Sequence, residues 1–168
     1  MTDLQVEKKL VLNYFNEIDS CNIESLSEVI SKYTSEDFSM KCTHPFNELG
    51  SADLVAKNLW KPIKDSFSPI QRRLDIFYAG INSLDKNKGK WISSMGHFMG
   101  VFHKPFVGLK PNYKSILLRF AEFYKVENNK ITEGAIFLDV MNLMQQLGLS
   151  IIPESTGLVC VTPGPMNH

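Results

Sequence analysis

The first third of the chain carries apolar residues at three- and four-residue steps, the spacing of helices that bury one face. We expect three helices there. Their apolar stripes lie at 4–18, 23–33 and 54–60, and Ser51 can cap the third one. Pro62 is expected to break the third helix or to open its last turn.

From residue 37 the period changes to two, which is typical of strands with one buried face. We expect strands at 37–43, 72–81, 90–103, 115–126 and 131–138. A helix at 140–147 should follow them and end at Gly148. Gly96 and Gly100 lie inside the longest strand, where glycines indicate bends or bulges. The order predicts an α+β fold with helices packed on a strongly curved antiparallel sheet. Such a sheet tends to enclose a conical pocket, the default ligand site.

Composition and charge narrow the classes of function. The length of 168 residues predicts a single domain over 1–168, with a core at about 4–148 and a tail at 149–168 that holds a short strand candidate, 158–162. Eighteen basic and eighteen acidic residues give no net charge, which argues against a nucleic-acid partner and against electrostatic membrane anchoring. No apolar run could span a bilayer, and the N-terminus has no signal-peptide pattern. Three scattered cysteines favour a reduced, cytoplasmic protein.

Five segments carry a family resemblance that covers nearly the whole chain, from about residue 10 to 165. They are THPFNELG (43–50), LWKPIKDSFSPIQRRLDIFYAG (59–80), WISSMGHFMGVF (91–102), RFAEFYKVENNKITE (119–133) and LDVMNLMQQLG (138–148). In order and residues the chain resembles the SnoaL-like polyketide cyclase group of the nuclear transport factor 2-like superfamily, which also contains ketosteroid isomerase and scytalone dehydratase.

The resemblance implies a cone of α+β structure, a deep pocket, frequent homodimers and metal-free acid–base chemistry. In the cyclases an acidic residue late in the chain acts as general acid and base in an intramolecular aldol closure. Related chains often carry two acidic residues three apart before the Gln-Leu-Gly stretch. Here Asp139 holds the second position and Ile136 occupies the first.

Asp139 is the first candidate for a general base. An aldol closure or a double-bond shift needs a base for an acidic C–H and an acid for the enolate, and one carboxylate in an apolar wall can serve both steps. Asp139 also stands between a strand and a helix, so it could equally be the N-cap of that helix.

Two further polar residues are candidates for the reaction. His97, in the long strand, could donate to a carbonyl or move a proton if it faces the pocket, or it could be a core or outer-face histidine. Arg119 could stabilise an oxyanion. Arg119 and Glu122 are three apart and face opposite sides of a strand, so only one can point into the pocket, and both could pair on solvent faces instead. Of Arg72 and Arg73, one is expected to be a solvated charge.

Several large apolar side chains and one loop histidine are candidates for holding a flat hydrophobic ligand. They are Tyr14, Met40, Trp60, Met95 and Met99, with His44 near the expected mouth of the pocket. The apolar members could instead be plain core, and His44 could order the turn at Pro45. The sequence has no metal-binding, nucleotide-binding or nucleophile motif, so we expect neither a metal nor a cofactor.

Two functions fit these observations. One is a cofactor-free cyclase, isomerase or dehydratase acting on a hydrophobic carbonyl-containing small molecule, which Asp139 and His97 favour. The other is a non-catalytic small-molecule carrier or dimerising module, which Ile136 favours. A structure can distinguish them: if Asp139 caps a helix and no other carboxylate enters the pocket, the enzyme is excluded. In either case we expect a hydrophobic ligand and a homodimer formed through the outer face of the sheet.

Overall fold

A six-stranded sheet in the order β2-β1-β6-β5-β4-β3 forms the frame of the molecule. The computed structural model describes residues 4–85 and 88–149. The strands are β1 (Thr34–Cys42), β2 (Glu48–Leu49), β3 (Gln71–Ile81), β4 (Lys90–Val101), β5 (Ser115–Glu127) and β6 (Lys130–Leu138). The helical elements are α1 (Gln5–Ser20), α2 (Leu26–Tyr33), α3 (Ala52–Val55), the π-helical turn η1 (Ala56–Trp60), α4 (Lys61–Ser66) and α5 (Val140–Gln146).

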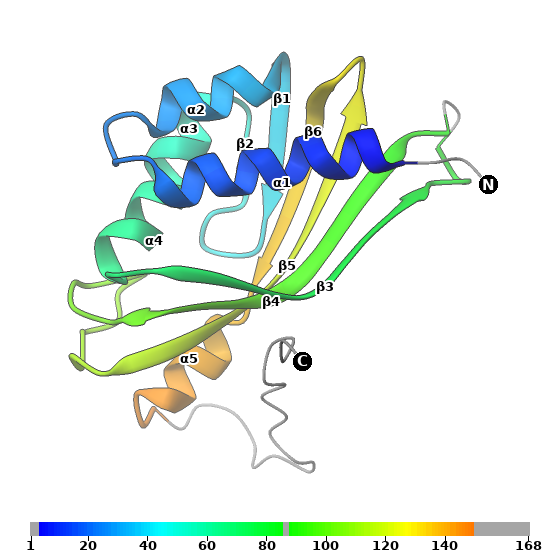
Figure 1. The fold of residues 1–168 in the computed structure, drawn as a ribbon. Helices are drawn as coiled ribbons and strands as arrows, with labels where there is room; N and C mark the ends of the chain where they lie inside the picture. The colour runs from blue at the N-terminus through cyan, green and yellow to red at the C-terminus, as the bar shows by residue number, and fades with distance from the viewer. Residues whose placement is uncertain (1–3, 86–87, 150–168) are drawn as a thin grey trace, which may run out of the picture.

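The helices are divided between the two faces of the sheet. Helices α1 to α4 cover one face of the strongly curved sheet, and α5 lies on the other side (Figure 1). We call these the helix-covered face and the outer face. The core lies between the first four helices and the sheet, and it includes fully buried Tyr14, Trp60, Phe98 and Phe120. None of the helices in the described part of the chain has the length and apolar character needed to span a bilayer.

The predicted α+β architecture is confirmed, with one difference in the sheet. The strand at 37–43 begins at Thr34 and pairs in parallel with β6, whereas the other neighbouring pairs in the sheet run antiparallel. Of the two alternatives for Pro62, the structure shows the second. Pro62 lies in the first turn of α4, where a missing N–H does no harm, and the helical path continues to Ser66. The predicted tail lies outside the described residues apart from Leu149.

Capping residues and turns fix the ends of several elements as the sequence indicates. The Ser51 side chain accepts a hydrogen bond from the Leu54 amide and so starts α3. Asn128 and Asn129 both have positive φ, which suits the tight β5–β6 turn. Gly148 has φ +78° and follows Leu147, the C-cap residue of α5, as expected of a helix stop.

A bulge in β3 bends the sheet beside the helices. The register between β3 and β4 shifts between Leu74 and Ile76, which leaves Asp75 as the extra residue. Gly96 lies opposite this bulge, and a Cβ atom there would lie 1.9 Å from the Arg73 carbonyl oxygen. The close approach of the two backbones therefore requires glycine at this position, as the expected bend at Gly96 suggested.

Candidate functional site

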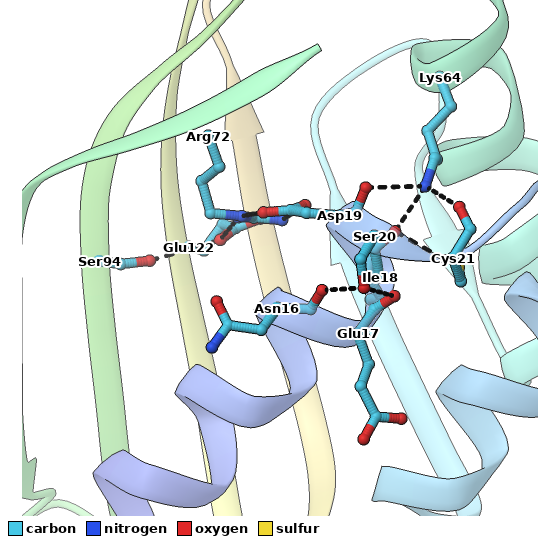
Figure 2. Close-up of polar contacts among 10 residues, drawn as sticks. All are labelled: Asn16, Glu17, Ile18, Asp19, Ser20, Cys21, Lys64, Arg72, Ser94 and Glu122. Atoms are coloured by element: carbon cyan, nitrogen blue, oxygen red, sulfur yellow. Dashed lines mark hydrogen bonds and ion pairs between the residues drawn. The ribbon is translucent and has the colours of Figure 1, made fainter. Parts of the chain in front are cut away.

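A buried ion pair lies at the centre of the helix-covered face. Arg72 of β3 donates from Nη1 to Oε2 of Glu122 on β5 at 2.6 Å (Figure 2). The side chains are 4% and 0% exposed, respectively. Ser94 of β4 also donates to Oε2, at a longer 3.4 Å. Because water does not reach this pair, its charges interact more strongly than those of a surface pair.

Asp19, in the last turn of α1, holds the other side of the Arg72 guanidinium. Its two carboxylate oxygens accept from Nε at 2.9 Å and from Nη2 at 3.3 Å, and its side chain is 31% exposed (Figure 2). Lys64 of α4 fixes this end of α1 by donating to the carbonyls of Ile18 and Cys21 at 2.6 Å each. A lysine here also complements the negative end of the helix dipole.

Four aromatic rings surround the Arg72 guanidinium. Its central carbon lies 4.2 Å from the ring centre of Phe15, 4.8 Å from Phe98, 5.1 Å from Trp60 and 5.4 Å from Phe120. Ring faces attract a cation, and the attraction is strongest where water is excluded. The rings and the two carboxylates together keep a full positive charge inside the molecule.

Within residues 4–85 and 88–149, four buried polar atoms that form no hydrogen bond of normal geometry lie in the same part of the interior. They are the hydroxyls of Tyr14 and Tyr124, the indole Nε1 of Trp60 and Oε1 of Glu122. Three of the four are donors. The Tyr14 and Tyr124 rings meet edge to face at 5.4 Å, and both hydroxyls lie within the electrostatic influence of Glu122. Buried polar groups are normally satisfied, so a cluster of unpaired ones suggests a place for water or a ligand.

Burial sets the protonation behaviour of this cluster. Desolvation raises the pKa of Glu122 above its usual range, and the nearby Asp19 carboxylate raises it further, although Arg72 opposes both effects. Desolvation and the Glu122 charge likewise raise the pKa values of the Tyr14 and Tyr124 hydroxyls, which keeps both as donors. A carboxyl group with a raised pKa beside neutral donors can take up and release a proton.

The structure places Asp139 at the N-cap of α5. Its Oδ1 accepts from the Asn142 amide at 2.9 Å, so the capping alternative is confirmed. Asp139 also borders an outer-face cavity of about 220 Å³ together with Met95, Arg119 and Phe137. Three of the residues proposed from the sequence therefore lie together, but on the face of the sheet opposite to Glu122.

His97 lies on the outer face as well. It alternates with Phe98, which packs against Trp60 on the helix-covered face. The imidazole Nδ1 lies 3.1 Å from Oδ2 of Asp75, the extra residue of the bulge, while Nε2 is buried and has no hydrogen-bond partner in the described part of the chain. Met99, two residues further along β4, lies on the same face.

The remaining candidates divide between core and loop. Tyr14, Met40 and Trp60 lie in the core, at most 1% exposed, and the Tyr14 hydroxyl and Trp60 indole belong to the unpaired cluster. His44 is exposed in the turn after β1.

Sequence reasoning did not select Arg72, Asp19 and Glu122 as a site. It did predict that Arg119 and Glu122 face opposite sides and that one of Arg72 and Arg73 is solvated. The structure confirms both predictions, with Glu122 inside and Arg73 exposed. A usable signal was present, because Glu122 follows Ile116, Leu118 and Phe120 and precedes Tyr124 and Val126 at two-residue steps on the apolar face of its strand.

Comparisons with known proteins concern the fold and one segment of the sequence. The family profile described as SnoaL-like polyketide cyclase matches residues 86–147. No curated protein matches the chain by sequence. A candidate SnoaL-like polyketide cyclase from Jannaschia sp. CCS1 is 13% identical, with a TM-score of 0.66 over 89% of this chain and 94% of its own.

Two Streptomyces proteins are similar in fold. AclR, a candidate hydroxylase from Streptomyces galilaeus, is 19% identical, with a TM-score of 0.64 over 88% of this chain and 85% of its own. IdmH, a candidate polyketide cyclase from Streptomyces antibioticus, is 13% identical, with a TM-score of 0.63 over 83% and 96%. Their different names agree with the rule that one fold hosts several chemistries. The chain therefore has the fold of the SnoaL-like polyketide cyclases, and its residues 86–147 carry their sequence pattern.

Proposed function

We propose that the chain is a SnoaL-like cyclase- or isomerase-type enzyme that moves a proton on a hydrophobic carbonyl compound, with Glu122 as general acid and base. The observation that carries the proposal is the unpaired Oε1 of a fully buried Glu122 among the unpaired donors of Tyr14, Tyr124 and Trp60. Asp139 does cap a helix, so the carboxylate on which this proposal rests is Glu122, which is fully buried among those donors.

The proposed step uses both kinds of group in the cluster. Oε1 of ionised Glu122 takes a proton from carbon next to the ligand carbonyl, and the C–H electron pair moves into an enolate. Hydrogen bonds from Tyr14, Tyr124 and Trp60 stabilise the oxygen that gains charge. Protonated Glu122 then returns the proton to a different carbon in an isomerisation, or to the new alkoxide after an aldol closure.

A binding module without chemistry is the second candidate. It is favoured by the 2.6 Å contact to Arg72, which holds Glu122 in an ion pair, and by the apolar, fully buried Ile136, where the resemblance to the cyclases leads us to expect a carboxylate. In that case the same cluster holds a ligand oxygen and transfers no proton.

Exchange of acidic C–H protons tests the catalytic proposal. We expect the protein to accelerate the loss of the α-protons of 2-tetralone in D₂O, followed by proton NMR. Glu122→Gln should lower the accelerated rate by about 100-fold or more, because it removes the acid–base group and keeps the shape. Gln also keeps a partner for Arg72, whose charge is still paired with Asp19.

Asp139→Asn is the matched control, because asparagine caps a helix as well as aspartate does. It should leave the exchange rate within about twofold of wild type. Equal rates for Glu122→Gln and wild type would contradict the assignment of Glu122. Wild-type protein that retains 2-tetralone in native mass spectra without accelerating exchange would support the binding module.

We also propose a homodimer through the outer face. Ile76, Met95 and Phe137 are exposed on this face, and together with Ala121 they occupy one row across four strands. A contiguous exposed apolar row is typical of an interface. Native mass spectrometry should give a dimer for wild type and a monomer for Phe137→Lys. Leu54→Lys, a control at an exposed leucine of α3, should remain dimeric. A monomeric wild type would contradict this proposal.

A further inference from the structure

We propose that Asp19 is a positioning residue that keeps Glu122 available for proton transfer. It does so by binding Nε and Nη2 of the Arg72 guanidinium with both carboxylate oxygens. The inference rests on the proposed function, since it explains how a carboxylate beside an arginine can still act as a base and an acid. Asp19 hydrogen-bonds to Arg72, and its negative charge also acts on Glu122 (Figure 2).

The geometry divides the arginine unequally between the two carboxylates. Asp19 uses both oxygens, on Nε and Nη2, which is the bidentate arrangement that arginine and carboxylate groups prefer. Glu122 meets only Nη1, and only with Oε2. Oε1 of Glu122 is therefore left without a partner, although a bidentate pair with Arg72 would have used both of its oxygens.

The charges around Glu122 lead to the same conclusion. The charged groups that act on it are Arg72 from β3 and Asp19 from α1, while Tyr14 from α1, Tyr124 from β5 and Ser94 from β4 are neutral. If Arg72, Asp19 and Glu122 were all ionised, the three side chains together would carry a net charge of −1. Glu122 is the more buried of the two carboxylates, so its ionised form carries the larger desolvation penalty, which raises the pKa of Glu122.

Removal of the Asp19 charge should therefore commit Arg72 to Glu122. In Asp19→Asn the carboxylate of Glu122 loses a nearby negative charge and becomes the sole anionic partner of the guanidinium. Both changes favour ionised Glu122, so its titration should move to lower pH. The ion pair should then hold the ionised carboxylate more firmly, which weakens it as a base.

Carboxyl ¹³C NMR of glutamate-labelled protein measures this directly, with Glu122→Gln to identify the Glu122 signal. We expect the titration midpoint of Glu122 to fall by about one pH unit in Asp19→Asn. Asp19→Glu keeps the negative charge, so its Glu122 midpoint should stay close to that of wild type. Asp65→Asn is the matched control, because Asp65 is a similarly exposed, ion-paired aspartate that contacts Lys61 and Lys104. It should leave the midpoint unchanged.

Two results would overturn the inference: an unchanged Glu122 midpoint in Asp19→Asn, or an equal shift in Asp65→Asn. The NMR readout does not depend on turnover. A shifted midpoint in a protein that never accelerates 2-tetralone exchange would keep the role of Asp19 and reject the catalytic function. Where exchange is accelerated, its pH profile should move down with the NMR midpoint in Asp19→Asn, which a purely structural loss would not produce.

Discussion

Replacing Arg72 with alanine is expected to lower the free energy of unfolding by about 3–5 kcal/mol, measured by chemical denaturation at neutral pH. The substitution leaves Glu122 buried without its counter-charge, since the carboxylate is fully enclosed. It also leaves a space among the rings of Phe15, Trp60 and Phe98, which pack on the guanidinium in the wild-type protein. Because Glu122 can take up a proton, the loss should become smaller as the pH falls.

The neighbouring arginine supplies the matched control. Arg73 is exposed, so Arg73→Ala should change the free energy of unfolding by less than about 0.5 kcal/mol. If both alanine variants lost the same amount, the ion pair would have no special role in stability.

A double variant separates the charge from the packing. Arg72→Met keeps most of the volume, and combining it with Glu122→Leu removes both buried charges while Asp19 stays at the solvent edge. Apolar replacement of a buried ion pair is often neutral or stabilising. We expect the double variant to be more stable than Arg72→Met alone, with the coupling measured by a double-mutant cycle. A pair that is unnecessary for stability and yet buried agrees with a role in function.

Local pattern was sufficient to predict most of the fold. The two-residue alternation and the turn residues placed both ends of β3, β4, β5 and β6 within two residues of where they lie. The alternation of apolar and polar residues shows which face of the sheet each residue lies on, but it does not show which strands pair with each other. The parallel pairing of β1 with β6, which joins residues about 95 positions apart, could therefore not be predicted.

The candidate site was harder to predict, for a physical reason. Charged residues in strands are usually solvated, and this held for Arg73 but not for Arg72. Arg72 can be buried because Asp19, 53 residues earlier in the chain on α1, compensates its charge. Asp139, in contrast, followed from local sequence alone, because a helix cap is a local structure.

Gly96→Ala is expected to lower the free energy of unfolding by about 3 kcal/mol or more. The added Cβ would lie 1.9 Å from the Arg73 carbonyl oxygen and 2.9 Å from its carbonyl carbon. Both contacts are to backbone, so no side-chain rotation relieves them, and β3 must move away from β4 at the bulge. Denaturant titration of the variant and of wild type measures the loss.

Gly80→Ala is the control for the loss of a glycine in the same sheet. Its Cβ would meet no atom within 4 Å, so we expect a change within about 1 kcal/mol of wild type. Near-equal stabilities of Gly96→Ala and Gly80→Ala would contradict the close approach at the bulge.

The position of Gly96 also connects the bulge to the candidate site. Arg72 directly precedes Arg73, the residue whose carbonyl approaches Gly96, and Asp75 follows in the bulge and pairs with His97 on the other face. A β3 strand displaced here should move the guanidinium away from Glu122, whose contact is only 2.6 Å long. In any Gly96→Ala protein that still folds, the carboxyl ¹³C titration of Glu122 should therefore shift upward, because the carboxylate loses its positive partner while it stays buried. An unshifted titration would mean that Arg72 is positioned by α1 and the aromatic rings rather than by the strand that carries it.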